Sequence, residues 1–278
     1  MVSLRQVYAD AKKRLCAAGL SNQNEINVLF KSAFGKSYPE LLLSDNIDEK
    51  DAARFEENVA RRIGGEPLQY IAGRWVFLDF ELSVGEGVLI PRDETETVAI
   101  EAIRLSKQIE NPVVVDLCAG TGCIAFAIKR AVPEARVTAV ELYDKAFEYL
   151  AKNKNELKLD VNLLKADVFV LESDLSDSWA DIIVANPPYV TNEEYEQNKE
   201  ELAHEPAQAL TDGGDGLSFY RHIISAYKPK LKESGYILFE TGSTQTEEVE
   251  RLLVEAGYRQ TEILEDMYGK KRAVRAKK

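Results

Sequence analysis

The amino-acid sequence predicts an α/β protein in which a doubly wound, mostly parallel sheet follows a small helical bundle. Apolar residues recur at helical spacing through residues 1–65, and from about residue 93 β-branched runs alternate with helical patterns. Strands that alternate with helices are typical of a parallel sheet covered by helices on both faces. A chain of 278 residues is long enough for two domains.

Three apolar stripes predict three helices near the N-terminus, within residues 4–15, 26–33 and 52–63. Ser3 is placed to cap the first helix, and Gly64-Gly65 to end the third. Nothing in these stripes suggests catalysis, so they predict a packed bundle.

The pattern changes to strict alternation over residues 74–90, which predicts a β-hairpin. The alternating apolar residues are Val76, Leu78, Phe80, Leu82 and Val84. We therefore expect a helical domain at 1–72, a hairpin linker at 73–92 and a catalytic domain at 93–278. Late strands are expected near 236–240, 259–265 and 271–276, with a helix near 245–256.

A strand, a glycine-containing loop and a helix are predicted over residues 113–128. The strand contains Asp116, and the loop reads Cys118-Ala119-Gly120-Thr121-Gly122. Glycines let a backbone turn tightly and approach a ligand closely, and the helix N-terminus favours an anionic group. Ala125 stands where a dinucleotide fingerprint requires its third glycine, so the loop alone is a weak signal.

Acidic residues close the next two predicted strands. Glu141 follows residues 136–140, where a carboxylate can accept both ribose hydroxyls, and Asp167 follows residues 161–166, where it could accept from an adenine amino group. Polar residues that could bind a ligand thus lie at four strand ends: Asp116, Glu141, Asp167 and Asn186. This combination is a more specific signal than any one of these residues.

The fourth strand end reads Asn186-Pro187-Pro188-Tyr189, after the apolar run 181–185. The prolines fix φ and remove two backbone donors, which leaves a stiff loop with free carbonyl acceptors. The Asn186 oxygen adds an acceptor, and the Tyr189 ring could stack on a flat group. This pattern favours methylation of a planar nitrogen held by its two N–H bonds.

These motifs, in this order, resemble the class I S-adenosylmethionine-dependent methyltransferases. Further segments resemble the release-factor glutamine N5-methyltransferases (PrmC/HemK family), from about residue 60 to the C-terminus. They are residues 65–73, 88–96, Glu205-Pro206, Ala209-Leu210 and Gly216-Leu217. The family usually has Pro where Asp93 stands. Some members have an aromatic residue where Val168 stands, so we expect plain apolar contact by Val168 with adenine here in place of stacking.

The resemblance implies a seven-stranded Rossmann-like sheet with an antiparallel last hairpin, and S-adenosyl-L-methionine as cofactor. It implies that the substrate is the Gly-Gly-Gln glutamine of peptide-chain release factors, docked by the helical domain. The expected catalytic residues are Asn186, Pro187, Pro188 and Tyr189. The expected cofactor-binding residues are Asp116, Cys118, Ala119, Gly120, Thr121, Gly122, Glu141, Asp167, Val168 and Asn186, with no metal.

The composition of the chain limits the classes of partner that we expect. The net charge of −12, from 35 basic and 47 acidic residues, repels phosphate, so nucleic acid is not the expected partner. The basic stretch 270–278 is interpreted as an edge strand and solvated tail. The polar stretch 190–217 is expected to be flexible and to border the substrate opening. Without a signal peptide or an 18-residue apolar run, a soluble, cytoplasmic protein is expected.

Three alternatives remain open at this point. The glutamine could belong to a ribosomal protein, since the same motif would serve. The target could be the N6 nitrogen of a flipped adenine in nucleic acid, which is also planar and conjugated. The protein could also be a non-enzymatic binding module, although its methyl-transfer motif would then have no function.

Overall fold

The computed structural model describes residues 3–42 and 47–278. Contacts divide the chain into two units, Met1–Trp75 and Val76–Lys278. Among the helices of the described residues, none has the length and apolar composition needed to cross a bilayer.

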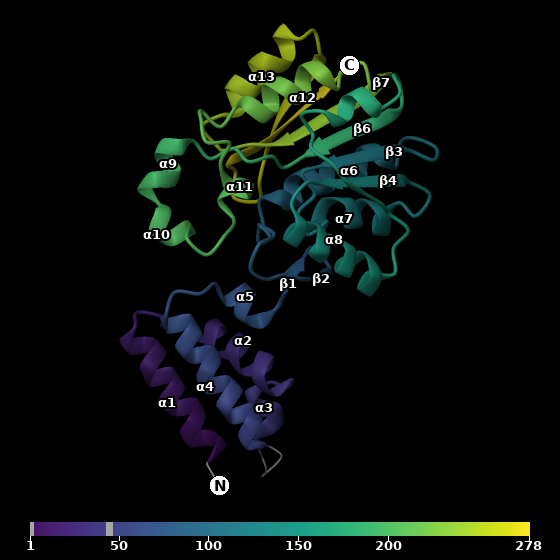
Figure 1. Ribbon diagram of the computed structural model, residues 1–278. Helices are drawn as coiled ribbons and strands as arrows, with labels where there is room; N and C mark the ends of the chain where they lie inside the picture. The colour runs from purple at the N-terminus through teal and green to yellow at the C-terminus, as the bar shows by residue number, and fades with distance from the viewer. Residues whose placement is uncertain (1–2, 43–46) are drawn as a thin grey trace. The chain divides into compact units, whose positions relative to one another are not determined.

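The first unit is a helical bundle, as its three apolar stripes predict (Figure 1). Its core contains Leu15, Leu29, Phe30, Phe55 and Val59, which are all buried. The helices are α1 (Leu4–Ala17), α2 (Gln23–Phe34), α3 (Tyr38–Leu41), α4 (Glu49–Ile63) and α5 (Leu68–Ala72).

The helix starts in this unit differ from the sequence prediction in one detail. Ser3 occupies the N-cap position of α1, but its side chain makes no capping hydrogen bond. The side chains of Asn22 and Asp48 do cap α2 and α4, by accepting from the backbone N–H groups of Asn24 and Lys50.

A short hairpin follows, with β1 (Arg74–Phe77) paired to β2 (Phe80–Ser83). It ends at Ser83, so the expected hairpin through residue 90 is too long. Phe77, Phe80 and Leu82 are buried in the core of the second unit, which makes most of the hairpin part of that unit.

The second unit contains a seven-stranded sheet in the order β5-β4-β3-β6-β7-β9-β8. The first five of these strands in spatial order are parallel, and β9 is antiparallel to both β7 and β8. The strands are β3 (Val113–Leu117), β4 (Arg136–Glu141), β5 (Asn162–Lys165), β6 (Ala180–Ala185), β7 (Leu231–Glu240), β8 (Arg259–Glu265) and β9 (Lys271–Lys277).

Helices cover both faces of this sheet (Figure 1). Side chains of α6 (Thr95–Ser106), α7 (Cys123–Ala131) and α8 (Asp144–Leu157) share one core with one face. Side chains of α12 (Ser218–Ala226) and α13 (Thr246–Glu255) share a second core with the other face. The predicted doubly wound sheet, with its antiparallel last hairpin, is confirmed.

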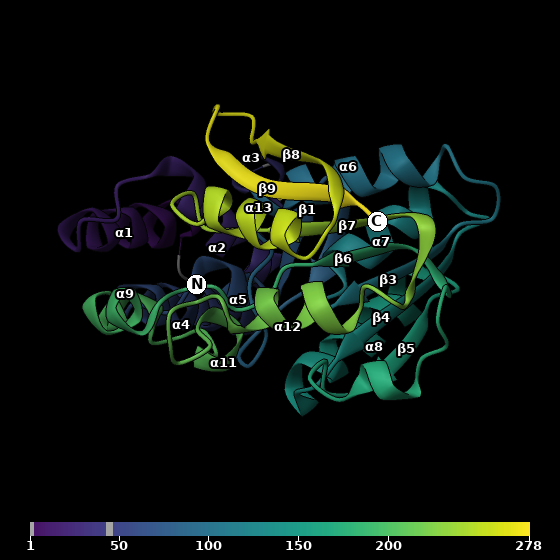
Figure 2. The same cartoon turned by 90° about the horizontal axis from the view of Figure 1, so that it is seen from above.

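The basic C-terminal stretch was expected at the edge, and this expectation is wrong. Strand β9 lies between β7 and β8, so β8 is the edge strand (Figure 2). Ala273, Val274 and Ala276 are buried, which fits an inner strand. The terminal Lys278 pairs with Glu233 instead of forming a solvated tail.

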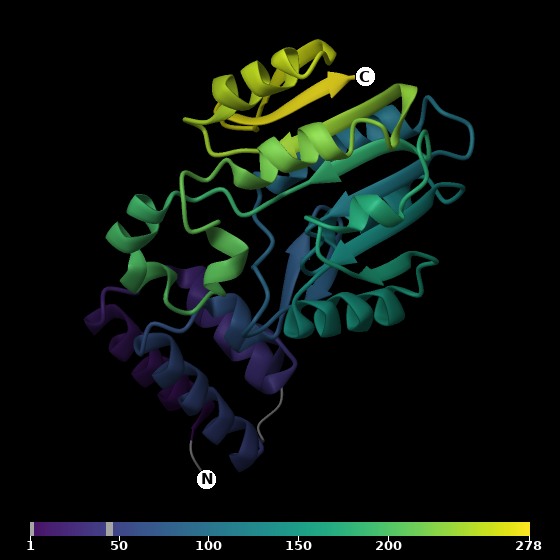
Figure 3. The same cartoon turned by 45° about the horizontal axis from the view of Figure 1, so that its top comes forward.

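The polar stretch 190–217 contains three short helices (Figure 3, green). They are α9 (Asn192–Gln197), α10 (Lys199–Leu202) and α11 (Ala207–Leu210). A capping box at Thr191 and Glu194 begins α9, so the stretch has more regular structure than its polarity suggested.

Candidate active site

A pocket lies within the second unit at the carboxyl ends of the parallel strands. The chain runs from β3 outward to β5 and then returns to β6, so the strand order reverses between β3 and β6. Ligands of doubly wound sheets bind in the crevice at such a reversal. The pocket is lined by residues 87–92, 118–121, 140–143 and 166–169 with Thr95, Cys123, Ile124, Ala146, Asn186, Pro188, Pro206, Gln208, Ala209 and Phe219.

The loop from β3 to α7 forms one wall of the pocket. Its backbone is tied to the neighbouring strand, since Ala119 N–H donates to the Val140 carbonyl over 2.8 Å. Gly122 has a φ of +86°, and a Cβ there would lie 2.3 Å from a carbon of the Phe126 ring. The glycine therefore permits both the turn and the close packing of α7. Gly122 itself does not line the pocket.

Asp116 lies beneath this loop and is not among the pocket-lining residues. Its Oδ2 accepts from the N–H of Ala125 near the start of α7, over 3.1 Å. Its buried Oδ1 has no hydrogen-bond partner among the described residues. Burial raises the pKa of Asp116 to about 8.

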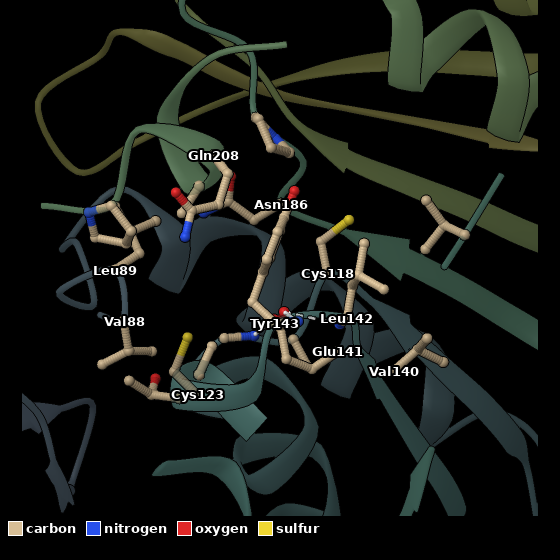
Figure 4. A pocket seen from close by; sticks show the side chains of 18 of the residues that line it. Val88, Leu89, Cys118, Cys123, Val140, Glu141, Leu142, Tyr143, Asn186 and Gln208 are labelled. Atoms are coloured by element: carbon tan, nitrogen blue, oxygen red, sulfur yellow. Dashed lines mark hydrogen bonds between the residues drawn. The ribbon is translucent and has the colours of Figure 1, made fainter. Parts of the chain in front are cut away.

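Glu141 presents its carboxylate at the pocket, at the end of β4. One oxygen accepts from Gly120 N–H at 2.9 Å, and the other accepts from the N–H groups of Leu142 and Tyr143 (Figure 4). Burial raises its pKa, and these three hydrogen bonds oppose that rise. A carboxylate has about four acceptor positions, so the oxygen bound to Gly120 keeps one for a ligand hydroxyl.

The pocket end near β5 is built from Asp167, Val168 and two aromatic rings. Asp167 Oδ1 accepts from Phe169 N–H at 2.9 Å. The Val168 carbonyl is already bonded to the Tyr227 hydroxyl at 2.8 Å. Phe169 and Phe219 meet edge to face at 4.8 Å and both line the pocket. Sequence reasoning missed these rings; the nearby signal was the Ala166-Asp167-Val168-Phe169 motif itself.

Two residues of the Asn-Pro-Pro-Tyr loop line the pocket, and the other two do not. Asn186 and Pro188 line the pocket, whereas Pro187 and Tyr189 are not among its lining residues. Asn186 Nδ2 donates to Thr95 Oγ1 at 3.3 Å, which leaves Oδ1 as the free acceptor of this amide. The Tyr189 hydroxyl donates to Glu240 Oε1 at 3.2 Å, so it is turned toward the interior.

Two segments far apart in sequence meet at the pocket rim. Arg92 forms an ion pair with Glu205, and the other Glu205 oxygen accepts from Ile90 N–H at 3.1 Å. This contact places α11, with Gln208, near Asn186 (Figure 4). His204 is exposed and does not line the pocket.

Two cysteines also line the pocket, on different sides of it (Figure 4). Cys118 and Cys123 are free thiols, and burial raises the pKa of each. Their thiols therefore stay protonated, and their small side chains serve as pocket wall.

Comparison with known proteins identifies the family. The PrmC N-terminal domain model matches residues 6–73, and the methyltransferase small domain model matches residues 96–235. The release factor glutamine methyltransferase of Fusobacterium nucleatum is 36% identical over 240 residues, which cover 85% of this chain and 67% of that protein. That of Moorella thermoacetica is 32% identical over 279 residues, 98% of this chain and 97% of that protein. This chain belongs to the release factor glutamine methyltransferase family.

Solved structures share the fold of this release factor glutamine methyltransferase family member. A methyltransferase from Pyrococcus furiosus matches with a TM-score of 0.50 at 16% identity, over 81% of this chain and 96% of that chain. The T. thermophilus 16S rRNA N2 G1207 methyltransferase, solved with AdoMet and guanosine, matches with a TM-score of 0.52 at 20% identity, over 74% of this chain and 49% of that chain.

In this family member, most of the site residues that the sequence predicts line the pocket. It includes Cys118, Ala119, Gly120, Thr121, Glu141, Asp167, Val168, Asn186 and Pro188, and excludes Asp116, Gly122, Pro187 and Tyr189. Sequence reasoning missed Thr95 and Glu240. Thr95 lies within the segment 88–96 that resembles the family, but nothing along the chain shows that it contacts Asn186. Glu240 closes a strand as Glu141 does, but nothing along the chain shows that it accepts from the Tyr189 hydroxyl.

Proposed function

We propose that this protein transfers a methyl group from S-adenosyl-L-methionine to the side-chain amide nitrogen of the Gly-Gly-Gln glutamine in peptide-chain release factors. The observation that carries the proposal is the Asn186 amide, whose nitrogen is bonded to Thr95 and whose oxygen remains to accept at the pocket. Family membership supplies the class of substrate. Release factors act in translation, so the proposed function belongs in the cytoplasm.

The pocket fits the proposed cofactor by its chemistry. Glu141 offers an acceptor for ribose hydroxyls, and the 118–121 loop allows a close approach by the methionine and ribose portions. Apolar contacts with adenine would come from Val168 and the Phe169 and Phe219 rings. When bound, S-adenosyl-L-methionine supplies an electrophilic methyl group on its sulfonium.

The chain's own residues would orient the glutamine amide. A glutamine amide nitrogen is a poor nucleophile because its lone pair is conjugated with its carbonyl. The Asn186 side-chain oxygen and the Pro187 carbonyl would accept its two N–H bonds. These acceptors would orient the nitrogen and favour the positive charge that develops on it during transfer. The methylated nitrogen is strongly acidic, so no dedicated base is required.

The test is mass spectrometry of a purified release factor incubated with this protein and S-adenosyl-L-methionine. A gain of one methyl group on the Gly-Gly-Gln glutamine is expected. A release factor with that glutamine substituted is the control and should gain nothing. If the cofactor binds but no methyl group is transferred, the proposed substrate is wrong, and ribosomal proteins and then adenine in nucleic acid would be tried.

A further inference from the structure

One buried asparagine lies behind the pocket and is hydrogen-bonded to two of the segments that form its walls. Asn153, on α8, is only 1% exposed and is not among the lining residues. Its carboxamide has two N–H donors and an acceptor oxygen, so it can bond to three backbone groups at once. A buried amide is costly unless it is hydrogen-bonded, so the partners of Asn153 decide its role.

Both N–H groups and the oxygen of this amide are used. Asn153 Oδ1 accepts from Ser83 N–H at 2.6 Å, and Nδ2 donates to the carbonyls of Ser83 and Thr121, each at 3.0 Å. A backbone N–H can only donate and a carbonyl can only accept, so these partners fix which way the amide points. One side chain thus joins the end of β2 to the loop between β3 and α7.

The two backbone segments that Asn153 joins belong to separate stretches of the pocket lining. Thr121 lines the pocket as the last residue of the 118–121 stretch. Ser83 ends β2, and the chain continues from there into the lining stretch 87–92. The amide therefore holds together two walls that come from distant parts of the sequence.

The backbones of both walls lie directly against α8. A Cβ at Gly85 would lie 2.0 Å from the Tyr149 hydroxyl oxygen, and one at Gly122 would lie 2.6 Å from Leu150 Cδ1. Tyr149, Leu150 and Asn153 all belong to α8. This helix therefore supports both walls, and the Asn153 amide is the α8 group that is hydrogen-bonded to both.

We propose that Asn153 is a positioning residue that holds the 118–121 loop and the 87–92 stretch in place around the cofactor. It acts through the backbones of Ser83 and Thr121 and does not itself line the pocket. The inference rests on the proposed function, because S-adenosyl-L-methionine is the ligand whose affinity it predicts.

The first test measures the Kd for S-adenosyl-L-methionine by calorimetry in the full chain and in Asn153→Leu. Leucine is similar in size to asparagine but cannot bond to the Ser83 or Thr121 backbone, so the two walls lose their connection. The Kd should rise roughly 10-fold, as expected for the loss of a buried hydrogen-bonded group. A folded variant with the wild-type Kd would overturn the proposal.

A matched control separates this role from general packing of the second unit. Thr246 is also fully buried there, and its hydroxyl donates to the Ser243 carbonyl at 3.1 Å. Neither residue lines the pocket. Thr246→Val should lower stability and leave the Kd unchanged. An equal rise of the Kd in Thr246→Val and Asn153→Leu would show general packing instead of positioning.

Hydrogen exchange of the cofactor-free chain, followed by NMR, tests the connection without a ligand. The N–H of Ser83 is bonded to Asn153 and that of Gly120, in the other wall, to Glu141. Both should exchange slowly in the wild type and faster in Asn153→Leu, whereas Thr246→Val should change neither. Slow exchange at both positions in Asn153→Leu would contradict the proposal.

Asn153→Asp distinguishes the two walls and replaces Asn153→Leu if that variant does not fold. Its carboxylate can still accept from Ser83 N–H but cannot donate to the Thr121 carbonyl. Exchange should therefore be faster at Gly120 and stay slow at Ser83, and faster exchange at Ser83 alone would reject the connection. If the wild type binds no S-adenosyl-L-methionine, the proposed cofactor is wrong, and the exchange results still retain or reject the connection between the walls.

Discussion

At the scale of single residues, Asn186 and Asp116 differ in how completely their polar atoms are partnered. The Asn186 nitrogen is bonded and its oxygen is available at the pocket. Asp116 has one oxygen on Ala125 N–H, and its other oxygen is buried without a partner among the described residues. The first arrangement suits transfer chemistry, and the second costs stability when the carboxyl is charged.

Asn186→Ala should chiefly lower turnover. Removing one preorganised hydrogen bond to the reacting group costs roughly 100-fold or more in kcat. The measurement is the initial rate of release factor methylation at saturating cofactor. Asn192→Ala, an exposed position in α9, is the control and should behave as wild type. Normal turnover in Asn186→Ala would contradict the role proposed for this side chain.

Asp116→Asn should change how stability depends on pH. The folded protein holds the Asp116 proton more tightly than the unfolded chain, because burial raises its pKa to about 8. The contribution of Asp116 to stability is therefore complete below the ordinary pKa of about 4 and is lost as pH rises toward about 8. Relative to the wild type, the variant should gain up to about 1.4 kcal/mol per pH unit across this window.

The measurement is urea denaturation of both proteins without cofactor at several pH values. Other titrating groups are common to both, so the difference in unfolding free energy isolates Asp116. A difference that does not vary with pH would mean that the group titrates near its ordinary range in the folded state.

At the scale of elements, the turn from β3 into α7 depends on Gly122. Two effects act there: a left-handed φ of +86°, and a Cβ position only 2.6 Å from Leu150 Cδ1 and closer still to Phe126. Gly213 offers a matched control, because its φ is +74° and nothing lies within 4 Å of a Cβ.

Gly213→Ala should therefore cost only the backbone strain, about 1–2 kcal/mol. Gly122→Ala should cost that strain and about 1–3 kcal/mol more for overpacking. Denaturant unfolding of the two variants measures the difference. Equal losses in both would show that α7 and α8 can shift to accommodate the added methyl group.

One element was misjudged from its composition. The basic stretch that forms β9 was expected at the sheet edge because its charges suggest solvent. Its Arg272 and Arg275 instead pair with Glu94 and Glu101 of the α6 region, while its small apolar residues enter the core. This error arises because charge pairing across the fold is invisible along the chain. The polar stretch 190–217 contains short helices, and a local capping box begins the first of them.

At the scale of the whole molecule, the two units have separate hydrophobic cores. The candidate active site lies entirely within the second unit. This separation predicts that cofactor binding and recognition of an intact release factor can be uncoupled.

A fragment of residues 76–278 should bind S-adenosyl-L-methionine as tightly as the full chain. If the helical unit docks the release factor, the fragment should methylate a Gly-Gly-Gln peptide but lose most activity on the intact release factor. Calorimetry and mass spectrometry measure the two properties. Full activity of the fragment on the intact protein would reject the docking role of the helical unit.

The sequence by itself determined the classes of element, the parallel sheet and the set of strand ends at which the pocket lies. These follow from local hydrophobic period, and from the rule that parallel strands bring their carboxyl ends to one edge. Asn186, Glu141 and the 118–121 loop could be named because each directly follows or closes a recognisable strand.

Only the tertiary structure decided which of these side chains reach the pocket and which lie behind it. Asp116 and Tyr189 have suitable chemistry but face buried partners. Thr95 and Asn186 are 91 positions apart and meet only when α6 and the end of β6 come together in the fold. Hydrogen bonds between distant elements leave no periodic trace in a single sequence, because their partners are selected by packing in three dimensions.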